Sequence, residues 1–254
     1  MPLAKPSTPA KHSTLDLPPG FTEVKLRELG DAYAHACAIA QAQGAGALVW
    51  VGRYDLVEFA VVLEPDEPLA GARRAHFAAM NAIGDAIAAH CPPERDVAFA
   101  WPDTVLFDGA LIGGLRLAWP QDCAEDQIPD WLVVGVMLRA ADLSHVDTGL
   151  VPGSTSLLSE GFEMLDCEAI IASFTRHLMT HFDRWKEKGF KAVAQDFFAR
   201  LPPGKAGERR AIDGDGDLRG HAPLDTGPAR RSSLVEALKQ AAWLDAQHGA
   251  PRLR

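Results

Sequence analysis

Residues 98–115 read AFAWPDTVLFDGALIGGL, and this stretch decides how the middle of the chain folds. Two runs of strand-forming residues flank Asp108-Gly109, a dipeptide strongly preferred in the two-residue turn of a β-hairpin. Gly113 and Gly114 interrupt the second run, and glycine inside a strand marks either a β-bulge or a close approach by a ligand or another backbone. The stretch therefore predicts an antiparallel hairpin whose second strand is either bulged or approached by a ligand.

The segments on either side of this stretch alternate between strand and helix patterns. Apolar residues at three- and four-residue spacing predict helices, and an Ala-rich run without proline predicts another near the start. Short β-type runs fill the middle of the chain. This order predicts an α+β fold with a mostly antiparallel sheet that helices cover on one side. The expected strands are 48–51, 57–63, 97–101, 105–107, 111–118 and 131–138, and the expected helices are 29–43, 77–87, 170–185 and 190–201.

Helix- and strand-breaking residues divide the chain into three parts. The proline-rich residues 1–20 are expected to form a flexible leader. The Leu201-Pro202-Pro203-Gly204 cluster ends a main domain over residues 21–201. Residues 202–254 form a small C-terminal module, in which 212–218 predict a hairpin turn and 232–244 predict a terminal helix.

The composition narrows the class of protein. The 254 residues carry a formal net charge of −9, with a pI of about 5.4. Nucleic acids and anionic membranes are negatively charged and bind positively charged proteins. This acidic chain is therefore not expected to bind either of them. Four scattered cysteines without a C-x-x-C pair argue against a zinc site or a disulfide framework and favour the reducing cytoplasm.

The central hairpin resembles a known superfamily. Trp101-Pro102-Asp103, followed after the turn by residues 110–115, resembles the K-W-P-N-D and K-x-A/G-G-I-L strands of the biotin/lipoate protein ligases. Residues 131–139 stand where those ligases have a third strand, and 155–162 resemble their T-S-L-x-E-x-G segment. The resemblance spans roughly residues 22–201 and implies the class II synthetase or biotin protein ligase-like fold.

The resemblance implies an activity and a site. A ligase of this superfamily activates a carboxylic acid with ATP and Mg²⁺, forms an acyl-adenylate, and transfers the acyl group to a lysine of a carrier protein. The acid would be biotin, lipoate or another acyl acid, the acceptor a biotinyl or lipoyl domain, and a homodimer is compatible with the family. No metal ligand is assigned within the chain. The implied binding residues are Arg53, Trp101, Asp103, Gly113, Gly114, Arg116, Gly135 and Arg139.

The chain departs from the family where cations are needed. The Gly/Arg-rich loop of the ligases is reduced to residues 51–55 with the single Arg53, and the family's bridging lysine aligns to Leu111, so no catalytic residue is assigned. Stabilisation of developing phosphate charge usually dominates such catalysis. Two hypotheses follow: a ligase in which Arg53, Arg116 and Arg139 supply the cations, or a ligand- or partner-binding relative that has lost adenylation.

Several further patterns have a plainer interpretation. Trp101 is either a pocket residue or a core residue at a strand end. His177 and His181 have metal-ligand spacing on a helix, but a solvated polar face is favoured. Residues 213–217 begin like a calcium loop without its required Gly and Glu, so a turn is favoured. The cysteines lack activating neighbours and are expected to be inert thiols.

Overall fold

The computed structural model describes residues 15–142, 152–162, 166–222 and 228–253. Its centre is a seven-stranded sheet in the order β1-β2-β3-β7-β6-β5-β4. All neighbouring strands are antiparallel except β1 and β2, which are parallel, so the mostly antiparallel sheet of the α+β prediction is confirmed. The strands are β1 Thr22–Leu26, β2 Ala47–Val51, β3 Leu56–Leu63, β4 Val97–Ala100, β5 Thr104–Phe107, β6 Ala110–Ala118 and β7 Leu132–Arg139.

The hairpin between β5 and β6 forms as expected. Asp108 and Gly109 both have positive φ angles, 46° and 83°, as a type I′ turn requires. The register shifts beyond the turn, because Leu106 pairs with Leu111 whereas Val105 pairs with Gly113. The intervening residue is therefore the extra residue of a β-bulge.

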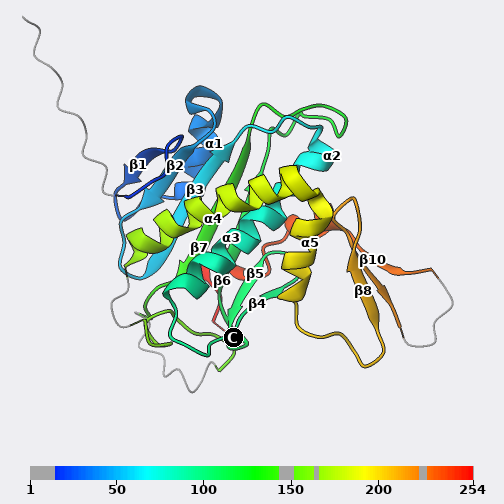
Figure 1. Ribbon diagram of the computed structural model, residues 1–254. Helices are drawn as coiled ribbons and strands as arrows, with labels where there is room; N and C mark the ends of the chain where they lie inside the picture. Colours follow the sequence, from blue (N-terminus) through cyan, green and yellow to red (C-terminus); the bar gives the residue numbers. More distant parts are fainter. Residues whose placement is uncertain (1–14, 143–151, 163–165, 223–227, 254) are drawn as a thin grey trace, which may run out of the picture.

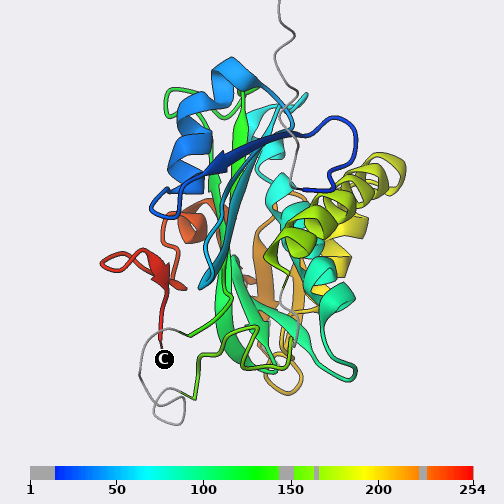
Figure 2. The same cartoon turned by 90° about the vertical axis from the view of Figure 1, so that its left-hand side faces the viewer.

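Helices cover both faces of the sheet, which corrects the expectation of one covered face (Figures 1 and 2). One face packs against α2 Leu69–Ala72, α3 Ala75–His90, α4 Cys167–Lys188 and α5 Phe190–Ala199, which with the sheet form the main core. The opposite face packs against α1 Ala32–Gln43, through Ala32, Ala36 and Ala40. Small alanine side chains give α1 only a weak amphipathic pattern, so the sequence did not show which face it covers.

The C-terminal module differs from its prediction in one element. The turn at residues 213–217 joins β8 Arg209–Ile212 to β9 Leu218–His221, and β10 Arg230–Ser232 completes a small sheet. The helix expected over 232–244 is limited to α6 Leu234–Leu238. The chain then leaves the helix and buries Trp243 against the main sheet, and this burial outweighs the helix propensity of the alanines around it. The short strands β11 Leu244–Asp245 and β12 Ala250–Pro251 follow.

The N-terminal end is partly described. Residues 1–14 of the expected leader lie outside the described residues, whereas Leu15 is buried in the main core. Within the described ranges, no helix is long and apolar enough to cross a membrane.

Candidate functional site

Several candidate residues lie on the α1 side of the sheet, between the start of α1 and the C-terminal residues. We call this the central strip, and define it by Glu58 on β3, Arg116 on β6, and Gly135, Met137 and Arg139 on β7. Register brings these residues together, because Glu58 pairs with Met137 and Arg116 pairs with Gly135. Four of the predicted residues, Arg53, Arg116, Gly135 and Arg139, lie in or beside the strip.

Arg53 lies in the short loop between β2 and β3. Its Nε and Nη2 atoms donate to the two carboxylate oxygens of Asp55, both at 2.7 Å, and its Nη1 lies 3.5 Å from Glu58 Oε2. The hydrogen bonds from Arg53 lower the pKa of Asp55, so this carboxylate stays ionised. The single arginine left in the shortened loop is thus neutralised by carboxylates of the chain.

The start of α1 points at the strip, and two of its N–H groups bond to carboxylates of the chain. Glu58 is 3% exposed and accepts a 2.9 Å hydrogen bond from the Ala32 N–H, while Asp31 accepts one of 2.8 Å from the Ala34 N–H. Burial raises the pKa of Glu58. A helix N-terminus is a ready site for an anionic ligand, but here two carboxylates of the protein occupy it.

Arg116 is the least constrained cation of the strip. Its guanidinium stacks 4.1 Å from the centre of the Tyr33 ring, and its Nη2 lies 3.8 Å from Asp31 Oδ1. The Tyr33 ring lies over Gly135, where a Cβ atom would come within 2.4 Å of it. Neither Tyr33 nor Glu58 belongs to the motifs of the resemblance, so the sequence does not point to them.

The remaining arginine and the leucine at the family's lysine position are covered by the C-terminal residues. Arg139 is 9% exposed, and its Nη2 donates to the backbone oxygen of Pro251. Leu111 is 1% exposed and packs with Met137 and Trp243. Burial lowers the pKa of the Arg139 guanidinium. Leu111 lies at the apolar floor of this face.

Gly114 and Asp103 meet Trp243, which the sequence analysis did not identify as part of the site. A Cβ on Gly114 would lie 2.4 Å from Trp243 Nε1, so the close approach expected here is made by the chain's own indole. The Asp103 carboxyl is hydrogen bonded to the indole and, at 3.2 Å, to the Thr104 hydroxyl. Burial raises the pKa of Asp103 to about 7. Gly113 lies at the bulge instead, with its missing Cβ facing the β7 backbone.

Trp101 lies apart from the other candidates. Its ring packs against Phe77 of α3 and Phe197 of α5, with centroid distances of 5.9 and 6.1 Å, on the opposite face of the sheet. The structure therefore supports the core role of Trp101 and not its role in the pocket. The motif holds Trp101 and Asp103, two residues apart, which face opposite sides of the sheet, and the resemblance alone did not separate them.

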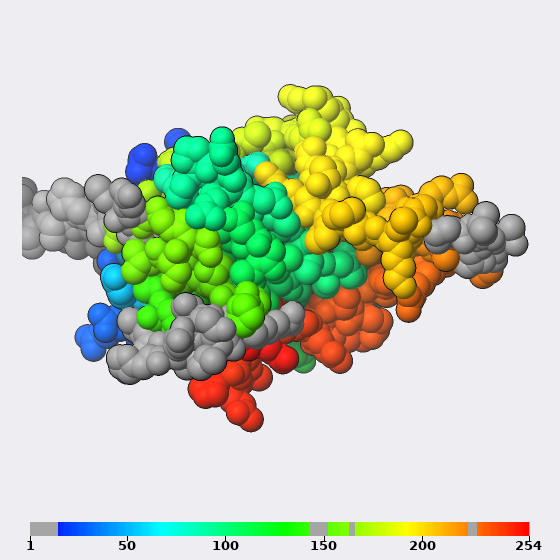
Figure 3. Space-filling model, turned by 90° about the horizontal axis from the view of Figure 1, so that it is seen from below, coloured from blue at the N-terminus to red at the C-terminus, as the bar shows by residue number. Residues whose placement is uncertain are grey.

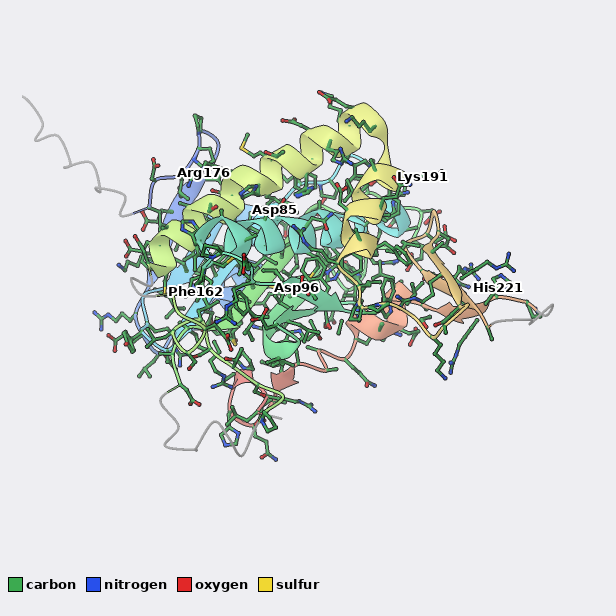
Figure 4. The ribbon with its side chains drawn as sticks, turned by 60° about the horizontal axis from the view of Figure 1, so that its bottom comes forward. Asp85, Asp96, Phe162, Arg176, Lys191 and His221 are labelled. Carbon is green, nitrogen blue, oxygen red and sulfur yellow. The ribbon has the colours of Figure 1, made fainter. Side chains whose placement is uncertain are left out.

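His181 corrects the expectation of a solvated histidine face. It is buried between α3 and α4, where its Nε2 lies 2.7 Å from Asp85 Oδ2, while Arg200 Nη2 lies 2.5 Å from the other oxygen (Figure 4). His177 is the half-buried member, with its Nδ1 3.8 Å from Asp85. The group ties three helices together on the side of the sheet away from the strip.

The turn at residues 213–217 forms, and it places carboxylate oxygens of Asp213, Asp215 and Asp217 within 4.8 Å of one another. Asp213 accepts N–H groups from Asp215 and Asp217 at 3.0 and 2.9 Å, as a turn residue does. Burial raises the pKa of the Cys37 and Cys167 thiols, which disfavours the nucleophilic thiolate.

Comparisons with known proteins agree with this fold. A crystal structure of a biotin protein ligase-like protein of unknown function from Silicibacter sp. TM1040 is similar, with 26% identity, a TM-score of 0.75, and coverage of 89% of this chain and 100% of that chain. Biotin protein ligase from Aquifex aeolicus has 13% identity, a TM-score of 0.63, and coverage of 83% and 95%. The Leishmania major ligase in complex with biotin has 13% identity, a TM-score of 0.55, and coverage of 85% and 99%.

The two ligases at 13% identity show the fold alone. No curated protein matches the chain. The sequence model of the Biotin/lipoate A/B protein ligase family, however, matches residues 17–199, which hold the whole seven-stranded sheet and helices α1–α5. The chain therefore belongs to the Biotin/lipoate A/B protein ligase family.

Proposed function

We propose that this protein binds a small carboxylic acid at the central strip and has lost the ATP-dependent adenylation of that acid. The observation that carries the proposal is the pairing of its cations. Arg53 is held by Asp55 and Glu58, and Arg139 by the Pro251 carbonyl. The position of the family's lysine is a buried leucine, Leu111.

The described residues of the strip do not fit the phosphates of ATP. Phosphoryl chemistry needs cations and N–H groups aimed at the charge that develops on phosphate. At the start of α1 those N–H groups already bond to Glu58 and Asp31. A phosphate placed there would meet the buried Glu58 carboxylate and the exposed Asp31 carboxylate, and like charges at close range repel each other.

A carboxylic acid carries less charge than the phosphates of ATP, and the single cation Arg116 can bind it. Its side chain is 22% exposed, and its ion pair with Asp31 is loose at 3.8 Å. An arginine can hold a carboxylate through two parallel N–H···O bonds. The Aquifex aeolicus ligase has been crystallised with biotin and ATP, so biotin is the first acid to test, followed by lipoate and short acyl acids.

The second candidate function is the complete ligase reaction. Arg116 favours it, because its guanidinium makes no hydrogen bond with the residues that the structure describes and could replace the missing lysine. In that case the protein would take ATP with Mg²⁺ and pass the acyl group to a biotinyl or lipoyl carrier domain.

Thermal stabilisation by ligand tests the proposal. A ligand that binds only the folded state stabilises it by about 2.7 kcal/mol at a hundred times its Kd. We expect biotin or a related acid to raise the melting temperature, and Arg116→Gln to weaken that binding at least tenfold. Arg230→Gln, which changes an exposed arginine of β10, is the matched control. If no acid stabilises the protein, the proposed function is wrong.

A further inference from the structure

The described C-terminal segment, residues 241–253, lies on the same face of the sheet as the central strip. Figure 2 shows it on the α1 side of the sheet, and in Figure 3 its red atoms lie along one side of the molecule. Its strands β11 and β12 pair antiparallel. Arg252 strengthens this hairpin, because its backbone N–H bonds to the Trp243 carbonyl and its Nε to the Leu244 carbonyl, both at 2.8 Å. The segment thus holds its own shape.

One aromatic side chain anchors the segment to the sheet. Trp243 is 0% exposed and packs against an apolar floor. Among residues 241–253 only Trp243 and Pro251 are buried, and the others are half-buried or exposed. The floor consists of Leu56, Leu111 and Met137.

Hydrogen bonds to the described residues around it add to this anchor. Arg139 bonds to the Pro251 carbonyl, and Ser154 Oγ lies 3.3 Å from the Arg252 carbonyl oxygen. A segment held mainly by one large side chain, with smaller apolar contacts from Ala241, Leu244 and Ala250 and some hydrogen bonds, can separate from the sheet without unfolding it, because segments with few buried contacts open locally at low cost.

The space that Trp243 fills has a definite chemistry. The glycine at position 114 lets a flat ring lie against the backbone, since a Cβ there would come within 2.5 Å of two indole atoms. The ring N–H donates to the Leu115 carbonyl at 3.3 Å and is hydrogen bonded to the Asp103 carboxyl. The space therefore accepts a compact flat ring with an N–H donor and apolar sides.

We propose that residues 241–253 are a lid, and that Trp243 occupies the subsite for the ring of the ligand. The proposal rests on the proposed function, because it names the ligand class of that same site: an acid whose ring carries an N–H donor. Such a ring can replace the indole against the Leu115 carbonyl and Asp103, while the acid group reaches Arg116. The ureido ring of biotin has this donor, whereas the dithiolane ring of lipoate has none.

The lid predicts a measurable change in ligand affinity. If the ligand binds only when the lid has left, its apparent Kd is the intrinsic Kd divided by the open fraction. Removing the anchor should therefore tighten binding by at least tenfold. The effect should be selective for ligands with the ring N–H.

The experiment compares Trp243→Ala and Trp243→Phe with the unchanged protein, by titration calorimetry with biotin, lipoate and indole. Indole should bind Trp243→Ala, because it refills the space that the substitution leaves. Biotin should bind Trp243→Ala at least tenfold tighter than the unchanged protein, and Trp243→Phe by an intermediate factor. Lipoate affinity should not change. Trp131→Ala and Trp131→Phe, which alter a half-buried tryptophan beside β7 and α1, are the controls and should leave all three affinities unchanged.

Each result tests a different part of the proposal. If biotin binds the unchanged protein, and Trp243→Ala binds it no tighter, the lid is wrong and the proposed function survives. If indole does not bind a folded Trp243→Ala, the subsite is wrong regardless of any acid. If neither the unchanged protein nor Trp243→Ala binds an acid, both the proposed function and the lid are wrong. If Trp243→Ala does not fold, the comparison uses Trp243→Phe alone. A biotin affinity of Trp243→Phe equal to that of the unchanged protein then shows that the lid is wrong.

Discussion

Arg53 donates to both carboxylate oxygens of Asp55, two residues further along the same loop, at 2.7 Å each. In this family the loop before β3 is where the resemblance implies cations for phosphate. Here the one arginine of the loop forms its ion pair with a carboxylate of the same chain. The account of lost adenylation depends on this pair and on its counterparts at Glu58 and Arg139.

Substituting Asp55 should release the arginine. Asp55→Asn removes the charge that holds Arg53, and a hydrogen bond to a charged group contributes about 1.5–3 kcal/mol. We expect the affinity for pyrophosphate, measured by titration calorimetry, to rise about tenfold, which corresponds to about 1.4 kcal/mol. Asp196→Asn is the control, because Asp196 forms a similar ion pair with Arg184 away from the strip. Equal pyrophosphate affinity in both variants would show that Asp55 does not restrain Arg53.

Restoring the family's lysine should fail. Leu111 is buried under Trp243, so Leu111→Lys places an ammonium group among the buried apolar side chains of Leu56, Met137 and Trp243. Large losses are characteristic of an unpaired buried charge, and we expect about 3 kcal/mol or more in the free energy of unfolding by urea. Leu111→Met keeps the volume and should cost less than about 1.5 kcal/mol. A Leu111→Lys variant as stable as Leu111→Met would contradict the buried position of this residue.

Asp103 should make stability fall with rising pH. Its pKa is raised to about 7 by burial, from 3.8 in its ordinary state. The folded state therefore holds a proton that the unfolded state has released, so the stabilisation is complete below about pH 4 and is lost as pH rises through 7. Relative to Asp103→Asn, the unchanged protein should lose about 4 kcal/mol between pH 4 and pH 8 in urea unfolding. Parallel pH profiles for the two proteins would rule this out.

Asp85 should act in the opposite direction. Burial alone would raise its pKa, but the hydrogen bonds from His181 and Arg200 outweigh burial and hold the pKa at about 2. Its stabilisation is present above about pH 4 and is lost as pH falls towards 2, with a total of about 2 kcal/mol. Asp85→Asn should therefore be less stable than the unchanged protein at pH 6, and the gap should narrow below pH 4. A gap independent of pH would contradict the charged pair.

Local sequence patterns predicted most of the main domain. The Asp108-Gly109 turn and the strand runs around it placed β4 to β7, because alternating β-formers and a type I′ dipeptide are local signals. The parallel edge strand β1 was missed. It is short, half-exposed and paired with a strand beyond α1, so its pairing is a property of the whole sheet.

The residues of the proposed site were predicted only in part, for a similar reason. Arg53, Arg116, Gly135 and Arg139 came from motif positions and do lie together. Glu58, Tyr33 and Trp243 reach the same face from other elements, and no spacing in the sequence links them to it. Trp243 also explains why the terminal helix ends early: its contacts lie more than a hundred residues away, where no local pattern can indicate them.

The most direct test of the central claim is ATP–pyrophosphate exchange, the reverse of acid activation. The purified protein is supplied with ATP, Mg²⁺ and, in turn, biotin, lipoate and short acyl acids, alongside an active biotin protein ligase as the positive control. The account predicts no exchange above background with any acid, including one that stabilises the protein against heat. Acid-dependent exchange would contradict the loss of adenylation, and the complete ligase reaction would then be the better description.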